Sequence, residues 1–329
     1  MGKEVRQEDI AKALGVSIVT VSRALADKEG VGQGLKKQIL DMAKNMGYTP
    51  KAVRQETNVT ATVAILIAEE YLQVEHSFFT AMQLHVSHSL TKLGVSSLLK
   101  ILGEDALFVL KNMPDFVGGI VVVGKLPPNL LRFCEQLDIS LVYLDFYVPE
   151  SRAISVIADG YLGAWETTRY LLEAGHSDIG YVGSIREDNN AEDRYFGYCK
   201  ALGEKGISPK EEWVLHNRAS KGFLEEYQLP QTMPTAFVCD CDQSAAIFVR
   251  DLSRKGYRVP EDVSVTGFYN HVFSSLSTPP LTTYHIDMAE MGRQAATAIT
   301  QDMLGVSVSK RIVISGEIYQ RDSVKKLIN

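Results

Sequence analysis

Arg23 lies in a short and nearly uncharged stretch near the start of the 329-residue chain, GVSIVTVSRAL at residues 15–25. On a helical wheel this stretch has two sides, one made of residues 20, 21, 24 and 25 and the other of Ile18, Val19, Ser22 and Arg23. In a DNA major groove, aliphatic side chains contact thymine methyl groups and an arginine binds guanine through two hydrogen bonds. The second side therefore has the chemistry of a DNA-recognition surface, although a three-helix core with an incidental arginine also fits this segment.

Apolar residues at helical spacing place this stretch in a head of three short helices. The spaced apolar positions are 10 and 14, then 21 and 25, then 35, 39, 42 and 46. Gly15 and Val16 separate the first helix from the second, and Ser17 is expected to cap the second. Gly47 and Pro50 end the third.

The charge of the chain is divided unevenly. The net charge is −6 at pH 7, but residues 1–57 hold ten basic and seven acidic residues, which makes that region +3 and the remainder −9. Basic regions attract the phosphates of nucleic acids. The composition therefore favours a small DNA-binding head before a larger acidic body, and 45% hydrophobic residues are enough for real cores.

From residue 61, short β-branched runs alternate with amphipathic segments, which is the pattern of parallel α/β structure. The expected strands are TVAILIA, SSLLKI, GGIVVV and VYLD, followed by DIGYVG, EWVLH, TAFVCD and DVSVTGF. Expected helices include about 78–93, 163–174, 191–205 and one ending at 255. The pattern predicts two doubly wound sheets. Ligands of such sheets bind beyond the carboxyl ends of the strands, here in a cleft between the halves.

Motifs in both parts of the chain match one known family. The head carries EDIAKALGVSIVTVSRAL followed by GYTPKAVRQ, and the body carries HSFF (76–79), RYFGY (194–198), VPEDVSVTGF (259–268), TPPLTT (278–283) and QRDS (320–323). The chain thereby resembles the LacI/GalR (lactose/galactose repressor) family of transcriptional regulators. The resemblance implies a helix-turn-helix head and a periplasmic-binding-protein-like body. Three crossovers would join the halves of that body, and its effector would be a sugar or a nucleobase.

The resemblance also assigns DNA-contacting roles. Ile18 and Val19 match base-reading positions, Arg23 matches a base-contacting arginine, and Ser17 and Ser22 match hydroxyls that contact phosphates.

The polar segment PKAVRQETNVTA, which follows the head, has the composition of a linker. In the family it folds into a hinge helix on operator DNA and inserts a leucine into the minor groove. Val53 matches a pairing position of that helix, and Arg54 is a further expected DNA contact. Thr57 occupies the place of the leucine, so the wedge is smaller and polar.

Asp145, at the end of VYLD, and Arg194, in RYFGY, match an acid and an arginine that bind ligands in the family. Paired across a cleft, they would accept and donate charge-assisted hydrogen bonds to a polyol, and an ion pair between the halves is the alternative. The expected effector-binding set is Phe78, Phe79, Asp145, Asn190, Arg194, Cys241, Asp242, Tyr269 and Asn270.

Part of this set departs from the family pattern. The family's Asn-Asp pair reads Cys-Asp at 241–242, and its Gly-Tyr-Asp-Asp reads GFYN at 267–270. Cys241 offers a weak donor in place of an amide, and Tyr269 offers a ring with a hydroxyl in place of a carboxylate. With Phe78 and Phe79, Tyr269 would make an aromatic pocket for a sugar's C–H face, although each ring also fits ordinary core packing.

The sequence lacks the motifs of other function classes. It contains no phosphate loop, GxGxxG, G-x-S-x-G elbow or Cys-His nucleophile pair, so we do not expect an enzyme. The four cysteines form no CxxC pair and are expected to be reduced thiols. His85 and His88 lack further metal ligands nearby, so neither a metal nor a cofactor is expected. Without a membrane-spanning run or a secretory signal, the protein is expected in the cytoplasm.

These inferences predict partners and domains. One head reads one half-site, so the family geometry implies a homodimer on pseudo-palindromic operator DNA, without the leucine-heptad tail of some relatives. A small-molecule effector, expected to be a carbohydrate, would control operator affinity. A phosphocarrier protein or a nucleobase-type corepressor is the alternative. The expected domains are a head at 1–49, a hinge at 50–60 and an effector and dimerisation domain at 61–329, whose halves are about 61–157 with 287–314 and about 158–286 with 315–329.

Overall fold

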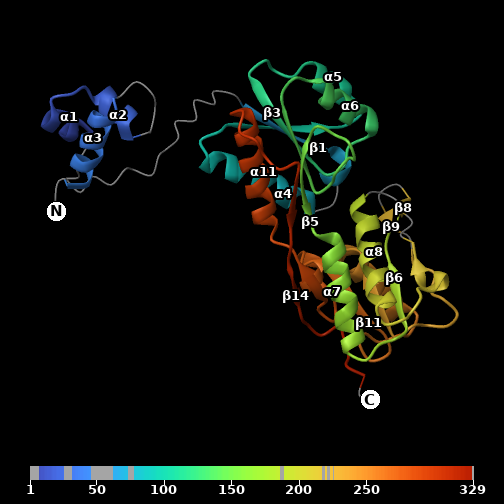
Figure 1. Cartoon of the computed structure of the whole chain (residues 1–329). Coiled ribbons are helices and arrows are strands. Elements are labelled where there is room, and N and C mark those ends of the chain that lie inside the picture. Colours follow the sequence, from blue (N-terminus) through green and yellow to red (C-terminus); the bar gives the residue numbers. More distant parts are fainter. Residues whose placement is uncertain are drawn as a thin grey trace. The chain divides into compact units, whose positions relative to one another are not determined.

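The computed structural model describes residues 7–25, 32–45, 62–72, 78–185, 189–216, 219–220, 223–224 and 226–327. The chain divides into two compact units, Met1–Asn58 and Val59–Asn329. We call the first unit the head and the second the body (Figure 1).

Three helices form the head: α1 (Gln7–Leu14), α2 (Ile18–Leu25) and α3 (Gln33–Asn45). Their buried core consists of Ile10, Ala11, Val21, Ala24, Ile39 and Ala43. The side of α2 opposite the predicted recognition surface packs inward, because Val21 and Ala24 are almost completely buried. Apolar side chains from all three helices thus meet in one small core, which fixes how α2 is held.

The first half of the body is a six-stranded sheet in the order β13-β5-β4-β3-β1-β2, with every pair parallel. Its strands are β1 (Thr62–Ala68), β2 (Ser97–Leu102), β3 (Val117–Val123), β4 (Ser140–Leu144), β5 (Ile154–Ala158) and β13 (Arg311–Ile314). Helices α4 (Phe78–Lys92) and α11 (Met288–Met303) pack on one face. Helices α5 (Ala106–Lys111) and α6 (Pro128–Gln136) pack on the other.

The second half has a sheet in the order β14-β12-β11-β10-β6-β7. Its strands are β6 (Ile179–Val182), β7 (Val214–Leu215), β10 (Ala236–Cys239), β11 (Ser264–Tyr269), β12 (Thr282–His285) and β14 (Glu317–Tyr319). Helices α7 (Gly160–Glu173) and α8 (Asn189–Gly203) cover one face, and α9 (Asp242–Arg254) covers the other. The short α10 (Val272–Leu276) contacts α9, and β8 (Ala219–Ser220) pairs with β9 (Phe223–Leu224) apart from the sheet.

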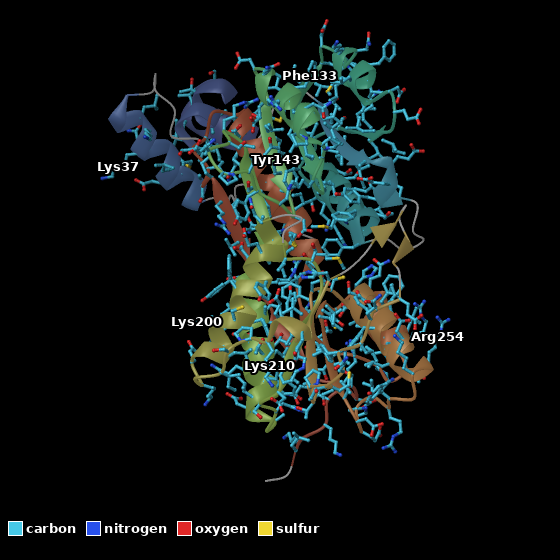
Figure 2. All side chains as sticks on the ribbon, turned by 90° about the vertical axis from the view of Figure 1, so that its right-hand side faces the viewer. Lys37, Phe133, Tyr143, Lys200, Lys210 and Arg254 are labelled. Atoms are coloured by element: carbon cyan, nitrogen blue, oxygen red, sulfur yellow. The ribbon has the colours of Figure 1, made fainter. Side chains whose placement is uncertain are left out.

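Both halves follow the usual division between apolar interior and charged surface. Inner strands such as β1 and β3 read as nearly continuous apolar runs because helices cover both of their faces, whereas the edge strands β2, β13 and β14 are partly exposed and carry charged residues. Tyr143 lies buried within the first half, whereas Lys200, Lys210 and Arg254 project from the surface of the second half (Figure 2).

Three short connections join the halves, as the family resemblance implied. They lie between β5 and α7, between β12 and α11, and between β13 and β14. The connections contact one another, because the Asp159 backbone N–H donates to the Ile314 carbonyl oxygen at 2.9 Å. The Gly316 N–H likewise donates to the Tyr284 hydroxyl at 2.9 Å.

The predicted fold class is confirmed, with two differences of detail. EWVLH was expected to be a strand, but residues 211–213 form a 3-10 turn and only Val214–Leu215 pair with β6. The second sheet is also not wholly parallel, because β14 runs antiparallel to β12. The chain enters β14 from β13 of the first sheet, at the same end of the second sheet where β12 leaves for α11 of the first half, so β14 runs opposite to β12.

Candidate functional site

In the head, α2 has a defined start. The Ser17 hydroxyl oxygen accepts a hydrogen bond from the Thr20 backbone N–H at 3.0 Å, so Ser17 caps the helix as predicted. The backbones of Ile18, Val19, Ser22 and Arg23 belong to α2, but their side chains lie outside the described part of the structure. The predicted hinge residues Val53, Arg54 and Thr57 also lie outside the described residues.

In the body, a cavity of about 250 Å³ opens at the carboxyl ends of strands from both sheets. In the first half, the cavity is lined by residues just after β1, by the residue just after β4 and by the start of α4. In the second half, it is lined by residues of α8, by residues after β10 and by the end of β11. The lining is Glu70, Tyr71, Phe78, Phe79, Asp145, Asn190, Arg194, Cys241, Asp242, Gln243, Phe268, Tyr269, His271 and Phe273. We call this cavity the central pocket.

Eight of the nine predicted effector residues line this pocket. The exception is Asn270, which is absent from the lining and belongs to another network. Its side-chain oxygen accepts hydrogen bonds from Arg321 Nη2 at 2.6 Å and from the Ser274 hydroxyl at 3.2 Å. Its amide nitrogen lies 3.3 Å from His285 Nδ1. Asn270 therefore ties β11 to α10 and to the C-terminal segment.

Asp145 is the first residue after β4, and its backbone φ is 68°, a value that residues other than glycine seldom adopt. Its backbone N–H donates to the Val156 carbonyl at 2.8 Å. Its own carbonyl accepts a hydrogen bond from the Asn190 amide of α8, so a residue of the second half is bonded to the backbone of the first. The other amide atom, Asn190 Oδ1, is buried and has no hydrogen-bond partner among the described residues, which leaves an acceptor for a ligand.

Tyr269 lies between Asp145 and Arg194. Arg194 Nη1 donates to the Tyr269 hydroxyl at 2.9 Å, and that hydroxyl donates to Asp145 Oδ1 at 3.3 Å. All three residues are at least nine-tenths buried. The acid and the arginine that the sequence predicted are thus brought to one pocket, joined through a tyrosine.

A series of aromatic contacts runs along the pocket. Ring centroids are 4.1 Å apart for Tyr71 and Phe79, 5.3 Å for Phe78 and Phe79, and 4.3 Å for Phe78 and Tyr269. His271 continues the series at 6.3 Å from Phe78. Flat apolar surfaces of this kind suit the C–H face of a sugar or the face of a planar heterocycle.

Cys241 and Asp242 have structural partners at the start of α9. Cys241 Sγ caps the helix, accepting from the Ser244 backbone N–H at 3.5 Å, and burial raises the pKa of its thiol to about 12. Asp242 accepts from the Thr283 hydroxyl and from the His271 backbone N–H, each at 2.6 Å. Burial nevertheless raises the pKa of Asp242 to about 7. Cys241 therefore fixes the first turn of α9, and Asp242 joins α9 to the loop after β11 at the edge of the pocket.

Six lining residues were not predicted: Glu70, Tyr71, Gln243, Phe268, His271 and Phe273. The sequence carried a usable signal for some of them. Glu70 and Tyr71 follow the carboxyl end of the expected strand TVAILIA, and Gln243 directly follows a predicted site residue. His271 and Phe273 lie just beyond β11 and are placed by the turn after that strand.

The described residues contain neither a group of three or more side chains suited to hold a metal ion nor a helix that is long and apolar enough to cross a membrane. All four cysteines are free.

Comparison with known proteins also divides the chain into a head and a body. Residues 8–51 match the family described as "Bacterial regulatory proteins, lacI family", and residues 168–324 match the family described as "Periplasmic binding protein-like domain". The HTH-type transcriptional repressor PurR of Pectobacterium carotovorum subsp. carotovorum (strain PC1) is 30% identical over 300 residues, which is 88% of this chain and 87% of that protein.

Solved structures share the fold along nearly the whole chain. A complex of the transcriptional regulator CelR with cellobiose has a TM-score of 0.69 at 22% identity, covering 97% of this chain and 99% of that one. The lac repressor dimer bound to operator and the anti-inducer ONPF has a TM-score of 0.66 at 21% identity, covering 98% and 100%. The similarity to these structures shows the fold. The match to the lacI family model and the similarity to the PurR repressor show the protein family. The chain belongs to the LacI family of DNA-binding transcriptional regulators.

Proposed function

We propose that the protein is a repressor that binds pseudo-palindromic operator DNA as a homodimer and that a carbohydrate bound in the central pocket controls its operator affinity. Ile18, Val19 and Arg23 would read bases, Ser17 and Ser22 would contact phosphates, and residues 50–60, with Val53, Arg54 and Thr57, would form the hinge. The head would be residues 1–49 and the effector domain residues 61–329, acting in the cytoplasm where operator DNA is found.

One observation carries the effector part of this proposal. Charged and amide groups from both halves meet aromatic faces in one cavity, and this combination is typical of a small-molecule site. The unpartnered Asn190 Oδ1 supplies an acceptor for a sugar hydroxyl. The aromatic series from Tyr71 to Tyr269 also favours a second candidate, a nucleobase-type corepressor stacked on these rings.

The DNA part is tested on sites selected in vitro from a random duplex library. In gel-shift titrations, Arg23→Ala should weaken binding to the selected site by roughly 1–3 kcal/mol and relax the preference at one base pair in each half-site. Arg169→Ala, which removes an exposed arginine of the body, is the control and should bind as wild type does. Equal affinity and selectivity for Arg23→Ala and wild type would contradict the assignment of the recognition helix.

The same titrations include an effector arm. Monosaccharides, cellobiose and nucleobases are first screened by thermal unfolding, because a ligand that binds the folded protein raises its melting temperature by mass action. Compounds that raise it are then added to the gel-shift assay, where they should change operator affinity. If none of them raises the melting temperature, control by a phosphocarrier protein becomes the better explanation.

A further inference from the structure

The Tyr269 hydroxyl makes the pair of hydrogen bonds that a ligand hydroxyl would make. It accepts from the Arg194 guanidinium at 2.9 Å and donates to the Asp145 carboxylate at 3.3 Å. A hydroxyl is both donor and acceptor, so it can join a cation to an anion in this way. Hydrogen bonds to charged groups are also the stronger kind, particularly where water is excluded.

These bonds cross between the two halves of the body. Asp145 follows β4 of the first sheet, whereas Tyr269 ends β11 and Arg194 lies on α8 in the second half. The Tyr269 ring also packs against Phe78 of α4, with centroids 4.3 Å apart. Tyr269 therefore contacts the first half through both its ring and its hydroxyl.

The backbone of Tyr269 is in an uncommon conformation. Its φ is 89°, a value that a tyrosine adopts only when its surroundings impose it. The residue is 7% exposed, so the side chain is enclosed on most sides. The surrounding contacts therefore hold the hydroxyl at the point where the acid and the arginine meet.

We propose that Tyr269 is an internal competitor of the effector: its hydroxyl takes the hydrogen-bonding position between Asp145 and Arg194 and holds the two halves of the body together when no effector is bound. This rests on the proposed function only in naming an effector as the molecule that competes. An effector reaches the acid and the arginine by displacing the tyrosine hydroxyl. Tyr269 thereby sets which ligands bind, because a ligand must offer better bonds than the tyrosine already makes.

The first experiment compares Tyr269→Phe with Tyr181→Phe by thermal unfolding of the full chain, without DNA or effector. Tyr181 is a matched control, since its hydroxyl is buried in the same half and has no hydrogen-bond partner among the described residues. Tyr269→Phe should lower the melting temperature by about 3–6 °C, because two bonds to charged groups are lost. Tyr181→Phe should leave it unchanged or raise it. Equal shifts for the two variants would overturn the proposal.

The second experiment tests the position of the hydroxyl directly. Tyr269→Ala removes the ring and leaves space of about the size of phenol beside Phe78, Arg194 and Asp145, and cavities made by removing a large side chain can bind small aromatic molecules. Phenol should raise the melting temperature of Tyr269→Ala by several degrees more than benzene does, because only phenol restores the bonds to Arg194 and Asp145. Wild type should show no such difference.

Equal stabilisation of Tyr269→Ala by phenol and benzene would overturn the proposal. The preference for phenol should also weaken when Tyr269→Ala is combined with Asp145→Leu or with Arg194→Met, since each change removes one of the groups that phenol should bind. An undiminished preference for phenol in both double variants would likewise overturn the proposal. Because no DNA or natural effector is used, failure here leaves the proposed function standing. Failure of the operator titrations likewise leaves this result unaffected.

Discussion

At the scale of single residues, Asp242 shows how the pocket's edge is held. Its side chain is 1% exposed, and burial raises its pKa from 3.8 to about 7, although hydrogen bonds from Thr283 and the His271 N–H act in the opposite direction. The folded protein therefore keeps this proton at pH values where the unfolded chain has lost it. By linkage, such a group stabilises the fold fully below pH 3.8, and that stability is lost as the pH rises towards about 7.

Asp242→Asn should remove this pH dependence while keeping the shape of the side chain. Between about pH 4 and 7, the free energy of unfolding of wild type relative to the variant should fall by up to roughly 1.4 kcal/mol per pH unit, and it should level off above that range. Urea unfolding of both proteins at intervals of half a pH unit measures the difference. Parallel curves across the range would contradict a raised pKa for Asp242.

At the scale of elements, the packing of α7 against α8 depends on a glycine. A Cβ added to Gly197 of α8 would lie 2.1 Å from the Tyr161 carbonyl oxygen and 3.0 Å from the Trp165 nitrogen, both backbone atoms of α7. Backbone atoms cannot move aside as a flexible side chain can. Since α8 also carries Asn190 and Arg194, the spacing of the two helices fixes how far these residues reach into the pocket.

Gly197→Ala should lower the free energy of unfolding by roughly 1–3 kcal/mol, because the two helices must separate to accept the methyl group. Gly203→Ala, on the same helix, is the control. A Cβ there meets nothing within 4 Å, and the substitution should stabilise the protein by about 0.4–1 kcal/mol. Chemical denaturation of the two variants checks the contrast, and a stable Gly197→Ala would mean that the interface tolerates the extra atom.

Some of these elements could be predicted from the sequence alone, and others could not. Buried parallel strands such as TVAILIA are continuous apolar runs, so their positions were predictable, and site residues at their ends, such as Asp145, could be expected from the topology. The antiparallel direction of β14 could not be predicted from the strand itself, because side-chain alternation is the same in either direction, and it follows only from the end at which the chain enters the second sheet. Nor could the bridge through Tyr269, which depends on a positive φ and on contacts with residues 75 and 124 positions away in the chain.

At the scale of the whole molecule, three short connections limit how the two halves of the body can rotate relative to each other. The last part of the chain returns through both sheets, adding β13 to the edge of the first and β14 to the edge of the second. Any change in the angle between the halves must therefore be taken up at residues 158–160, 285–288 and 314–317. Asn190 and Tyr269 bridge the halves, so we expect their hydrogen bonds to favour the angle at which both can form.

Under the proposed function, operator binding also depends on the proposed hinge, where Thr57 occupies the position of the family's leucine wedge. Inserting a side chain into the minor groove unstacks a base step, and apolar burial offsets that cost. A threonine buries less apolar surface than a leucine. The protein should therefore bend its operator less than a relative with the leucine does.

Thr57→Leu should raise affinity for an operator with a flexible central pyrimidine–purine step, such as CG or TA, and should increase the bend. Half-site preference should not change, because Ile18, Val19 and Arg23 are untouched. Thr57→Val is the matched control, since it removes the hydroxyl without lengthening the side chain and so separates polarity from reach. Gel-shift affinity and circular-permutation mobility measure both effects for the three proteins. Lower affinity with no added bend in Thr57→Leu would show that this hinge does not act by insertion.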